Sequence, residues 1–160
     1  MPEPTAWNRN TFRKRYSLMG DISEDRFGIY CILNGIKNIR FGFNRPDFAK
    51  FYNLPLALKH MPDRLIEVGN DHYFVEVKGC GQDALIKIKK EDLTALGFWN
   101  NLLPVNFAVY DSSLNSLHYG TTLEEVEKMK TECEVKQFDD NRKEYYLFKK
   151  EMFREWIVLQ

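Results

Sequence analysis

The alternation of apolar and polar positions is clearest near the middle of the chain, where it predicts two paired strands. Residues 63–68 form a short strand-like run, the cluster 69–71 is typical of a turn, and residues 72–78 alternate with aromatic and β-branched side chains. Successive side chains of a strand point to opposite faces, so Glu76 and Lys78 should project on the same side. The pattern therefore predicts a β-hairpin with both groups on one face.

Helical patterns are expected on both sides of this hairpin. After a loose leader at 1–9, we expect a helix that is broken or capped near Gly20 and ends at Asn34-Gly35, where glycine can adopt the left-handed conformation. Apolar residues at spacings of three and four predict a second helix, which opens at 89–93 and ends at 102–104.

Short apolar runs predict further extended segments, with turn residues between them. We expect them at 36–43, 84–88, 105–110, 114–119 and 145–148. Residues 48–60 are interpreted as a short helix or an ordered excursion. Thr121 or Thr122, followed by acidic residues, predicts a helix start, and a short terminal helix is expected around 153–157.

Composition adds a size and a class to this picture. The 160 residues are 44% hydrophobic and 14% aromatic, enough for one compact domain with its own core. No apolar run reaches the ~20 residues that a membrane span needs, and the start lacks signal-peptide character. Three cysteines without metal-ligand spacing favour a reduced, cytosolic protein.

The hairpin also carries candidate chemistry. If the start of its first strand pairs with the end of its second, Asp63 lies beside Glu76 and Lys78. Carboxylate oxygens suit Mg²⁺ or Mn²⁺, and a nearby lysine can stabilise the charge that builds up on an attacked phosphate. The alternative is the solvated face of an ordinary edge strand after a Pro-Asp turn.

The order of these features resembles the PD-(D/E)xK nuclease superfamily, whose restriction-endonuclease-like fold includes Holliday junction resolvases and phage endonucleases. The motif here is Pro62-Asp63, then Glu76-Val77-Lys78, and the resemblance covers about residues 16–120. It implies an α/β fold with a mixed central β-sheet flanked by helices. It also implies Asp63 and Glu76 as metal ligands, with help from the carbonyl of Val77, and Lys78 as the residue that assists the nucleophilic water.

Many members also carry a glutamate in their first helix, a few residues after a glycine. Gly20-Asp21-Ile22-Ser23-Glu24 looks like that feature, which makes Glu24 a candidate catalytic and metal-binding carboxylate. Residues 21–24 fit a helix-start capping box equally well, in which Glu24 would bond back to the backbone.

Nucleic-acid contacts must come from local patches, because 23 basic and 23 acidic residues leave no net charge to attract DNA. In the family, the helix after the motif often lends a polar side chain to the site, and Lys89 or Lys87 is the nearest match. His60 could contact a phosphate, although a lone histidine is more often structural. The basic clusters are Arg13-Lys14-Arg15, then Lys87, Lys89 and Lys90, and finally Arg142-Lys143 with Lys149-Lys150.

Together these features predict a Mg²⁺- or Mn²⁺-dependent deoxyribonuclease, by analogy a structure-selective or partner-directed enzyme of phage or mobile-element origin. Aromatic residues near the C-terminus could form a homodimer surface. The alternatives are a noncatalytic nucleic-acid-binding module and an assembly protein on the same fold.

Overall fold

The structure is a computed structural model that describes residues 12–42, 50 and 53–155. Its helices are α2 (Phe12–Leu33), α3 (Leu56–Lys59), α4 (Lys90–Asn100) and α5 (Leu123–Met129), with short 3₁₀ turns η3 (Lys130–Glu132) and η4 (Lys150–Met152). Its strands are β1 (Lys37–Arg40), β2 (Arg64–Val68), β3 (Asp71–Cys80), β4 (Leu85–Lys89), β5 (Val105–Asp111), β6 (Ser116–Thr122), β7 (Glu134–Gln137), β8 (Glu144–Lys149) and β9 (Arg154–Glu155).

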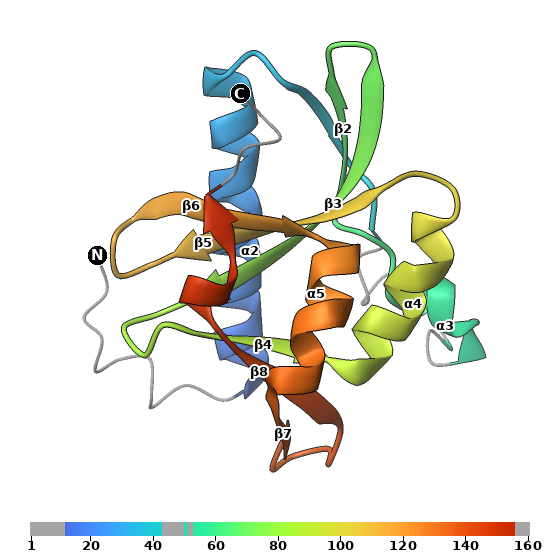
Figure 1. Ribbon diagram of the computed structural model, residues 1–160, viewed down its shortest axis with the longest axis vertical. Helices are drawn as coiled ribbons and strands as arrows, with labels where there is room; N and C mark the ends of the chain where they lie inside the picture. Colours follow the sequence, from blue (N-terminus) through green and yellow to red (C-terminus); the bar gives the residue numbers. More distant parts are fainter. Residues whose placement is uncertain (1–11, 43–49, 51–52, 156–160) are drawn as a thin grey trace.

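The strands form two sheets (Figure 1). The larger has six strands in the order β1-β2-β3-β5-β6-β9, and the smaller has three in the order β4-β8-β7. The larger sheet is mixed, because β3 and β5 run parallel while its other neighbours are antiparallel. Parallel neighbours need a long crossover, and here the chain makes it through β4 and α4. All seven residues of β5 are buried, as expected for a central strand covered on both faces.

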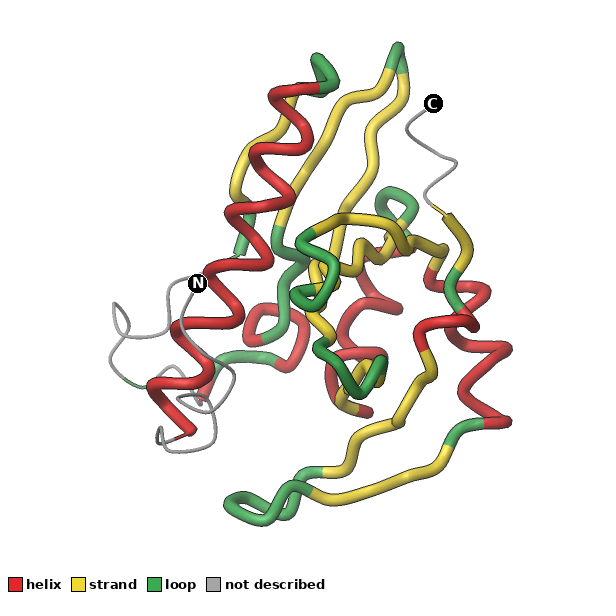
Figure 2. Tube along the Cα trace, turned by 90° about the vertical axis from the view of Figure 1, so that its left-hand side faces the viewer, coloured by secondary structure: helices red, strands yellow, loops and turns green. Residues whose placement is uncertain are grey.

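Helix α2 covers one face of the larger sheet, as Figures 1 and 2 show from two directions. Its buried residues Ser23, Phe27 and Cys31 recur every four positions, which aligns them on one side of the helix. Phe27 and Cys31 join Val75 and Val77 of β3 in a single apolar cluster. The helix therefore lies against the strand that carries the motif.

The helix is continuous through Gly20, so the predicted break at that residue is wrong. Packing of Phe27 and Cys31 against the sheet stabilises the helix, and this outweighs the modest cost of one glycine. The predicted stop is confirmed: Gly35 has φ +67°, and the Ile36 N–H donates to the Cys31 carbonyl at 2.8 Å.

The opposite face of the larger sheet is covered by α4, α5 and the smaller sheet. The main apolar cluster lies here and includes Phe74 of β3, Phe107 of β5, Leu96 of α4, Val126 of α5 and Phe148 of β8. Alternation along β3 thus divides its side chains between a layer under α2 and a layer under α4.

The predicted hairpin is confirmed. Arg64 pairs with Val75 and Val68 with Asp71, and Gly69 makes the turn with φ +62°. The Thr122 side chain caps α5 by accepting from the Glu125 N–H at 3.2 Å, one of the two caps that the sequence allowed.

Other predicted boundaries were displaced. Helix α4 ends at Asn100, before 102–104, and β1 covers only four residues. Strand β7 was missed because all of its residues are exposed and it has no apolar face to signal it. Strand β9 occupies residues at which a terminal helix was expected. The leader at 1–9 and the aromatic residues Phe48, Phe51 and Tyr52 lie outside the described residues.

Candidate active site

Asp63 lies at the point where β2 begins, beside the middle of β3. The last β2–β3 pair is Arg64 with Val75, so the Val77 N–H extends past the end of β2. Asp63 Oδ2 accepts a hydrogen bond from this N–H at 2.7 Å. The aspartate therefore takes over a backbone donor that a longer strand would have satisfied, and its carboxylate is fixed next to the motif.

Glu76 and Lys78 project from β3 toward α4, on the face opposite Val77, as their alternation predicts. The Lys78 amine donates to Glu76 Oε1 at 2.7 Å and to Asp92 Oδ2 at 3.1 Å. Its side chain is only 18% exposed, and Asp63 also acts electrostatically on it. The structure brings Asp63, Glu76 and Lys78 together at one edge of the hairpin.

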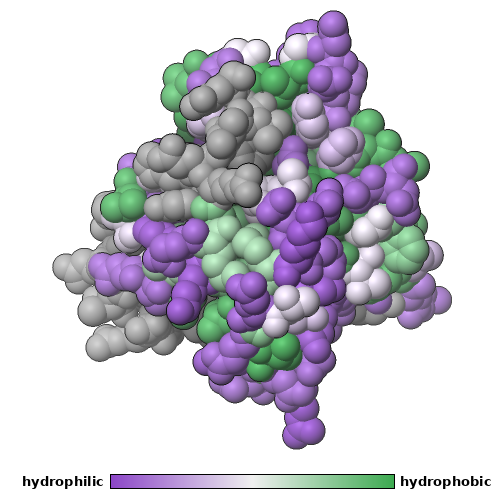
Figure 3. All heavy atoms as spheres, viewed as in Figure 1, coloured by the Kyte–Doolittle hydropathy of each residue, from purple (hydrophilic) through white to green (hydrophobic). Residues whose placement is uncertain are grey.

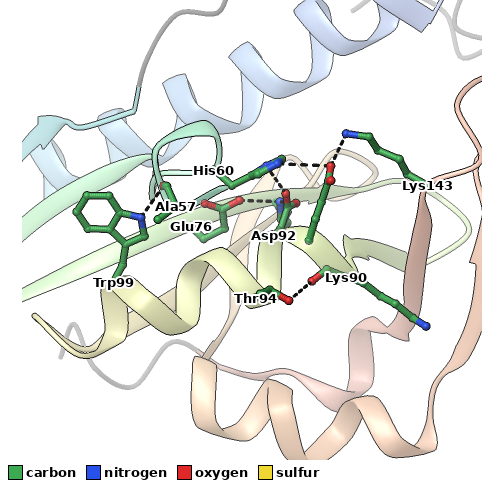
Figure 4. A network of polar contacts seen from close by, with 10 residues as sticks. Ala57, His60, Glu76, Lys90, Asp92, Thr94, Trp99 and Lys143 are labelled. Atoms are coloured by element: carbon green, nitrogen blue, oxygen red, sulfur yellow. Dashed lines mark hydrogen bonds and ion pairs between the residues drawn. The ribbon is translucent and has the colours of Figure 1, made fainter. Parts of the chain in front are cut away.

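Asp92 and His60 complete this cluster (Figure 4). Asp92 stands in the first turn of α4, and its Oδ1 lies 2.9 Å from His60 Nδ1. His60 also lies near Glu91, which accepts from Lys143 at 2.6 Å. The sequence prediction missed Asp92. The signal that could have found it is an acidic residue in the first turn of the helix after the motif. The prediction instead favoured Lys87 or Lys89 as the polar side chain that this helix lends to the site.

The charges in this cluster are unequally stabilised. Burial raises the pKa of Asp63 well above its ordinary value, and the neighbouring carboxylates of Glu76 and Glu24 raise it further. Burial also raises the pKa of Glu76, because the attraction of Lys78 only partly offsets it.

Two other charged groups of the cluster are well stabilised. Burial alone would raise the pKa of Asp92, but Lys78 and His60 hold it below its ordinary range. Glu76 and Asp92 outweigh burial at Lys78 and raise its pKa. Negative charge is therefore unfavourable on Asp63 and Glu76 and favourable on Asp92.

Two solved structures share this architecture. Hjc, a Holliday junction resolvase from the archaeal hyperthermophile Archaeoglobus fulgidus, matches with a TM-score of 0.57 at 10% identity, over 88% of this chain and 99% of that one. D212, a nuclease from a fusselovirus, matches with a TM-score of 0.50 at 10% identity, over 91% and 88%. This chain has the restriction-endonuclease-like fold. No family model and no curated protein matches the sequence.

On this restriction-endonuclease-like fold, Glu24 extends from α2 and acts electrostatically on both motif carboxylates. One of its oxygens lies 3.9 Å from Arg40 Nε. Residues 21–24 lie well inside α2, so the alternative that they form a helix-start capping box is wrong. That box requires free N–H groups, and only the first turn of a helix has them.

Two of the predicted basic patches lie close together, because β4 pairs with β8, which directly follows Lys143 and ends at Lys149. Lys87 and Lys89 extend from β4, with Lys87 over the rings of Phe138 and Tyr145 at 5.9 and 5.4 Å. Lys90 pairs with a carboxylate oxygen of Glu144 at 3.0 Å. Arg13, Lys14 and Arg15 belong to the start of α2, and their side chains lie outside the described part of the chain.

The donor set suits a hard divalent cation. Within the described residues, no three His, Cys, Asp or Glu side chains stand in an arrangement that could by itself hold a metal. Mg²⁺ commonly uses only one or two carboxylates, with water and substrate oxygens completing its shell. Asp63 and Glu76 match that requirement, and a bound cation would relieve the carboxylate repulsion that adds to burial in raising the pKa of Asp63.

None of the described helices is long and apolar enough to cross a membrane.

Proposed function

We propose that this protein is a metal-dependent nuclease that hydrolyses phosphodiester bonds in DNA. The observation that carries the proposal is the meeting of Asp63, Glu76 and Lys78 on the β2–β3 hairpin, where the two acids are held close together at a cost in charge repulsion. Buried groups with perturbed pKa values are typical of functional sites. Two proteins described as a Holliday junction resolvase and a nuclease share the fold, which supports the same class of activity.

In this proposal, Asp63 and Glu76 hold Mg²⁺ or Mn²⁺, with the Val77 carbonyl as a further ligand. A metal bound there would supply Lewis acidity for the activation of water and for the neutralisation of charge on the phosphate. Lys78, kept charged by its two acidic neighbours, orients the attacking water and stabilises the negative charge that develops on the phosphate. Glu24, on α2, would add negative charge to the metal site, since it already acts electrostatically on both ligands.

DNA contacts are proposed for the outward face of the smaller sheet. Residues opposite one another in paired strands share a face, and Lys89 and Lys136 both pair with Tyr145. Lys87 lies two residues before Lys89 on β4 and therefore projects from the same face. The other face of β4 supplies core residues such as Ile88. Figure 3 shows hydrophilic residues around the projecting β7–β8 hairpin. These lysines would bind phosphates with the strong salt dependence of counterion release.

The decisive experiment is a cleavage assay with Mg²⁺ or Mn²⁺ on a panel of junction, flap, nicked and linear DNAs. Asp63→Ala, Glu76→Ala and Lys78→Ala should each reduce cleavage by at least roughly 10²-fold, as expected when a group that stabilises transition-state charge is removed. Glu24→Gln should lower activity with little change in stability.

Metal binding gives a second measurement that does not depend on the choice of substrate. Mn²⁺ should raise the melting temperature of the wild type, because a metal that binds only the folded protein stabilises it. The melting temperature of Asp63→Ala should not change, because this variant lacks one of the two carboxylates that would bind the metal. Equal metal shifts in both proteins, with no cleavage of any DNA, would exclude the nuclease and leave a noncatalytic module on the same fold.

A further inference from the structure

A buried polar pair lies directly behind Lys78. Asp92 divides its two carboxylate oxygens between partners: Oδ2 accepts from the Lys78 amine at 3.1 Å, and Oδ1 accepts from His60 Nδ1 at 2.9 Å. The side chains of Asp92 and His60 are only 12% and 8% exposed. Burial of a charged acid is costly unless its oxygens are satisfied, and here both oxygens bind a donor.

This pair is mounted on parts of the fold other than the motif hairpin. Asp92 belongs to the first turn of α4, and His60 follows α3. The two helices pack together, and the Trp99 indole N–H of α4 donates to the Ala57 carbonyl of α3 at 2.9 Å (Figure 4). Asp92 is therefore held by α3 and α4, separately from the carboxylates of the hairpin.

The two acids that hold Lys78 are not equivalent. Glu76 is also a proposed metal ligand, and a divalent cation on its carboxylate would weaken its attraction for the lysine and repel the ammonium group. Asp92 lies on the other side of the amine and carries no proposed metal contact. Removing Glu76 as a partner therefore leaves Asp92 to keep Lys78 in place.

We infer that Asp92, oriented by His60, is the positioning residue that retains the Lys78 ammonium group at the reacting centre once Glu76 binds a cation. The inference rests on the proposed nuclease function. His60 serves the same centre in a second way, because it lies three residues before Asp63 and anchors the segment that leads to this ligand. Residues that orient the surroundings of a metal site typically contribute 10- to 100-fold, as a rough range.

A spectroscopic experiment tests the retention of Lys78 directly. In ¹⁵N-labelled wild-type protein, the Lys78 ammonium group should give a slowly exchanging NH₃⁺ signal, identified by its absence in Lys78→Met, both before and after saturation with Mg²⁺. In Asp92→Asn the signal should be present without metal, through Glu76, and disappear when Mg²⁺ is added. A signal in Asp92→Asn that survives Mg²⁺ as it does in the wild type would overturn the inference.

Kinetics separate this inference from the proposed function. Asp92→Asn should lower kcat about 10- to 100-fold with KM for DNA little changed, and should retain the Mn²⁺-dependent rise in melting temperature. Glu91→Gln is the matched control, because Glu91 is the adjacent acid on α4 and contacts His60 and Lys143 rather than Lys78. If the wild-type protein neither cleaves DNA nor responds to metal, the proposed function is wrong. If the wild type is active and Asp92→Asn is equally active, only the inference about Asp92 is wrong.

Variants of His60 keep the test valid if Asp92→Asn fails to fold. His60→Asn places an amide N–H near the position of Nδ1 and should preserve most of kcat, whereas His60→Phe lacks the donor and should lower it. Equal activity of the two folded variants would show that orientation by His60 plays no part.

Discussion

Two buried acidic centres of the larger sheet differ in how completely their charge is satisfied. At the end of β5, Asp111 is fully buried, and it accepts from the Lys150 amine at 2.8 Å and from the Ser113 hydroxyl and N–H at 2.6 and 2.9 Å. Burial would raise its pKa, but these donors outweigh burial and lower it. At the hairpin, Asp63 has the Val77 N–H and two carboxylate neighbours, and its pKa is raised.

The difference separates a structural acid from a candidate ligand. Asp111 ties the turn after β5 to Lys150 of η4 and so joins the larger sheet to the chain that leaves the smaller one. The raised pKa of Asp63 means that folding disfavours its charged form, and buried groups perturbed in this way are typical of functional sites. A bound cation would supply the missing partner.

The largest stability effect is expected at the satisfied acid. Asp111→Asn should destabilise the protein by about 2–3 kcal/mol. This loss is somewhat smaller than that expected from breaking a fully buried ion pair, because the Lys150 side chain is 19% exposed. Urea unfolding measures this loss. DNA cleavage per folded molecule should be unchanged, since Asp111 lies outside the proposed site. A loss of cleavage without a loss of stability would remove the distinction between the two centres.

At the unsatisfied acid, the opposite sign is expected. Asp63→Asn should stabilise the protein at neutral pH by on the order of 1 kcal/mol, because the amide oxygen can still accept from Val77 N–H while the repulsion from Glu76 and Glu24 is removed. Cleavage should be lost. Lower stability at neutral pH would show that the Asp63 charge is favourable and that the site resembles Asp111 after all.

The pH dependence of this gain follows from the raised pKa of Asp63. A carboxyl group whose pKa is raised on folding stabilises the native state below its unfolded value near 3.8, and this contribution is lost as the pH rises through the folded value. The advantage of Asp63→Asn over the wild type should therefore shrink as the pH falls from neutral toward 3.8. Unfolding curves collected across this range provide the measurement.

The smallest effect concerns the close approach of α2, which brings Glu24 toward the hairpin. A Cβ at Gly79 would lie 2.7 Å from Ser23 Oγ, and this buried hydroxyl has no hydrogen-bond partner among the described residues. Gly79→Ala should cost about 1 kcal/mol, at the low end for overpacking because the hydroxyl can turn about one bond. Adding Ser23→Ala should recover most of that cost, as the next contact is 3.9 Å. Thermal melts of the two single variants and the double variant test this coupling.

Several parts of the fold were predictable because their signals are local. Alternation and the turn at Gly69 predicted the hairpin with Glu76 and Lys78 on one face, and Gly35 marked the end of α2. The capping role suggested for Glu24 was wrong because α2 already begins at Phe12, nine residues before Asp21. A motif of four residues cannot reveal where the helix around it starts. Asp92 and His60 were not placed in the site, since their contact depends on how α3 packs against α4.

The amino-acid sequence alone determined the hairpin and the types of groups on it, because strand periodicity and turn chemistry act between near neighbours. Only the tertiary structure decided which acids are satisfied. Asp92 meets Lys78, Asp111 meets Lys150, and Asp63 meets other carboxylates. The physical reason is that the pKa of a buried group depends on burial and on charges a few ångströms away, and folding brings these together from distant parts of the chain.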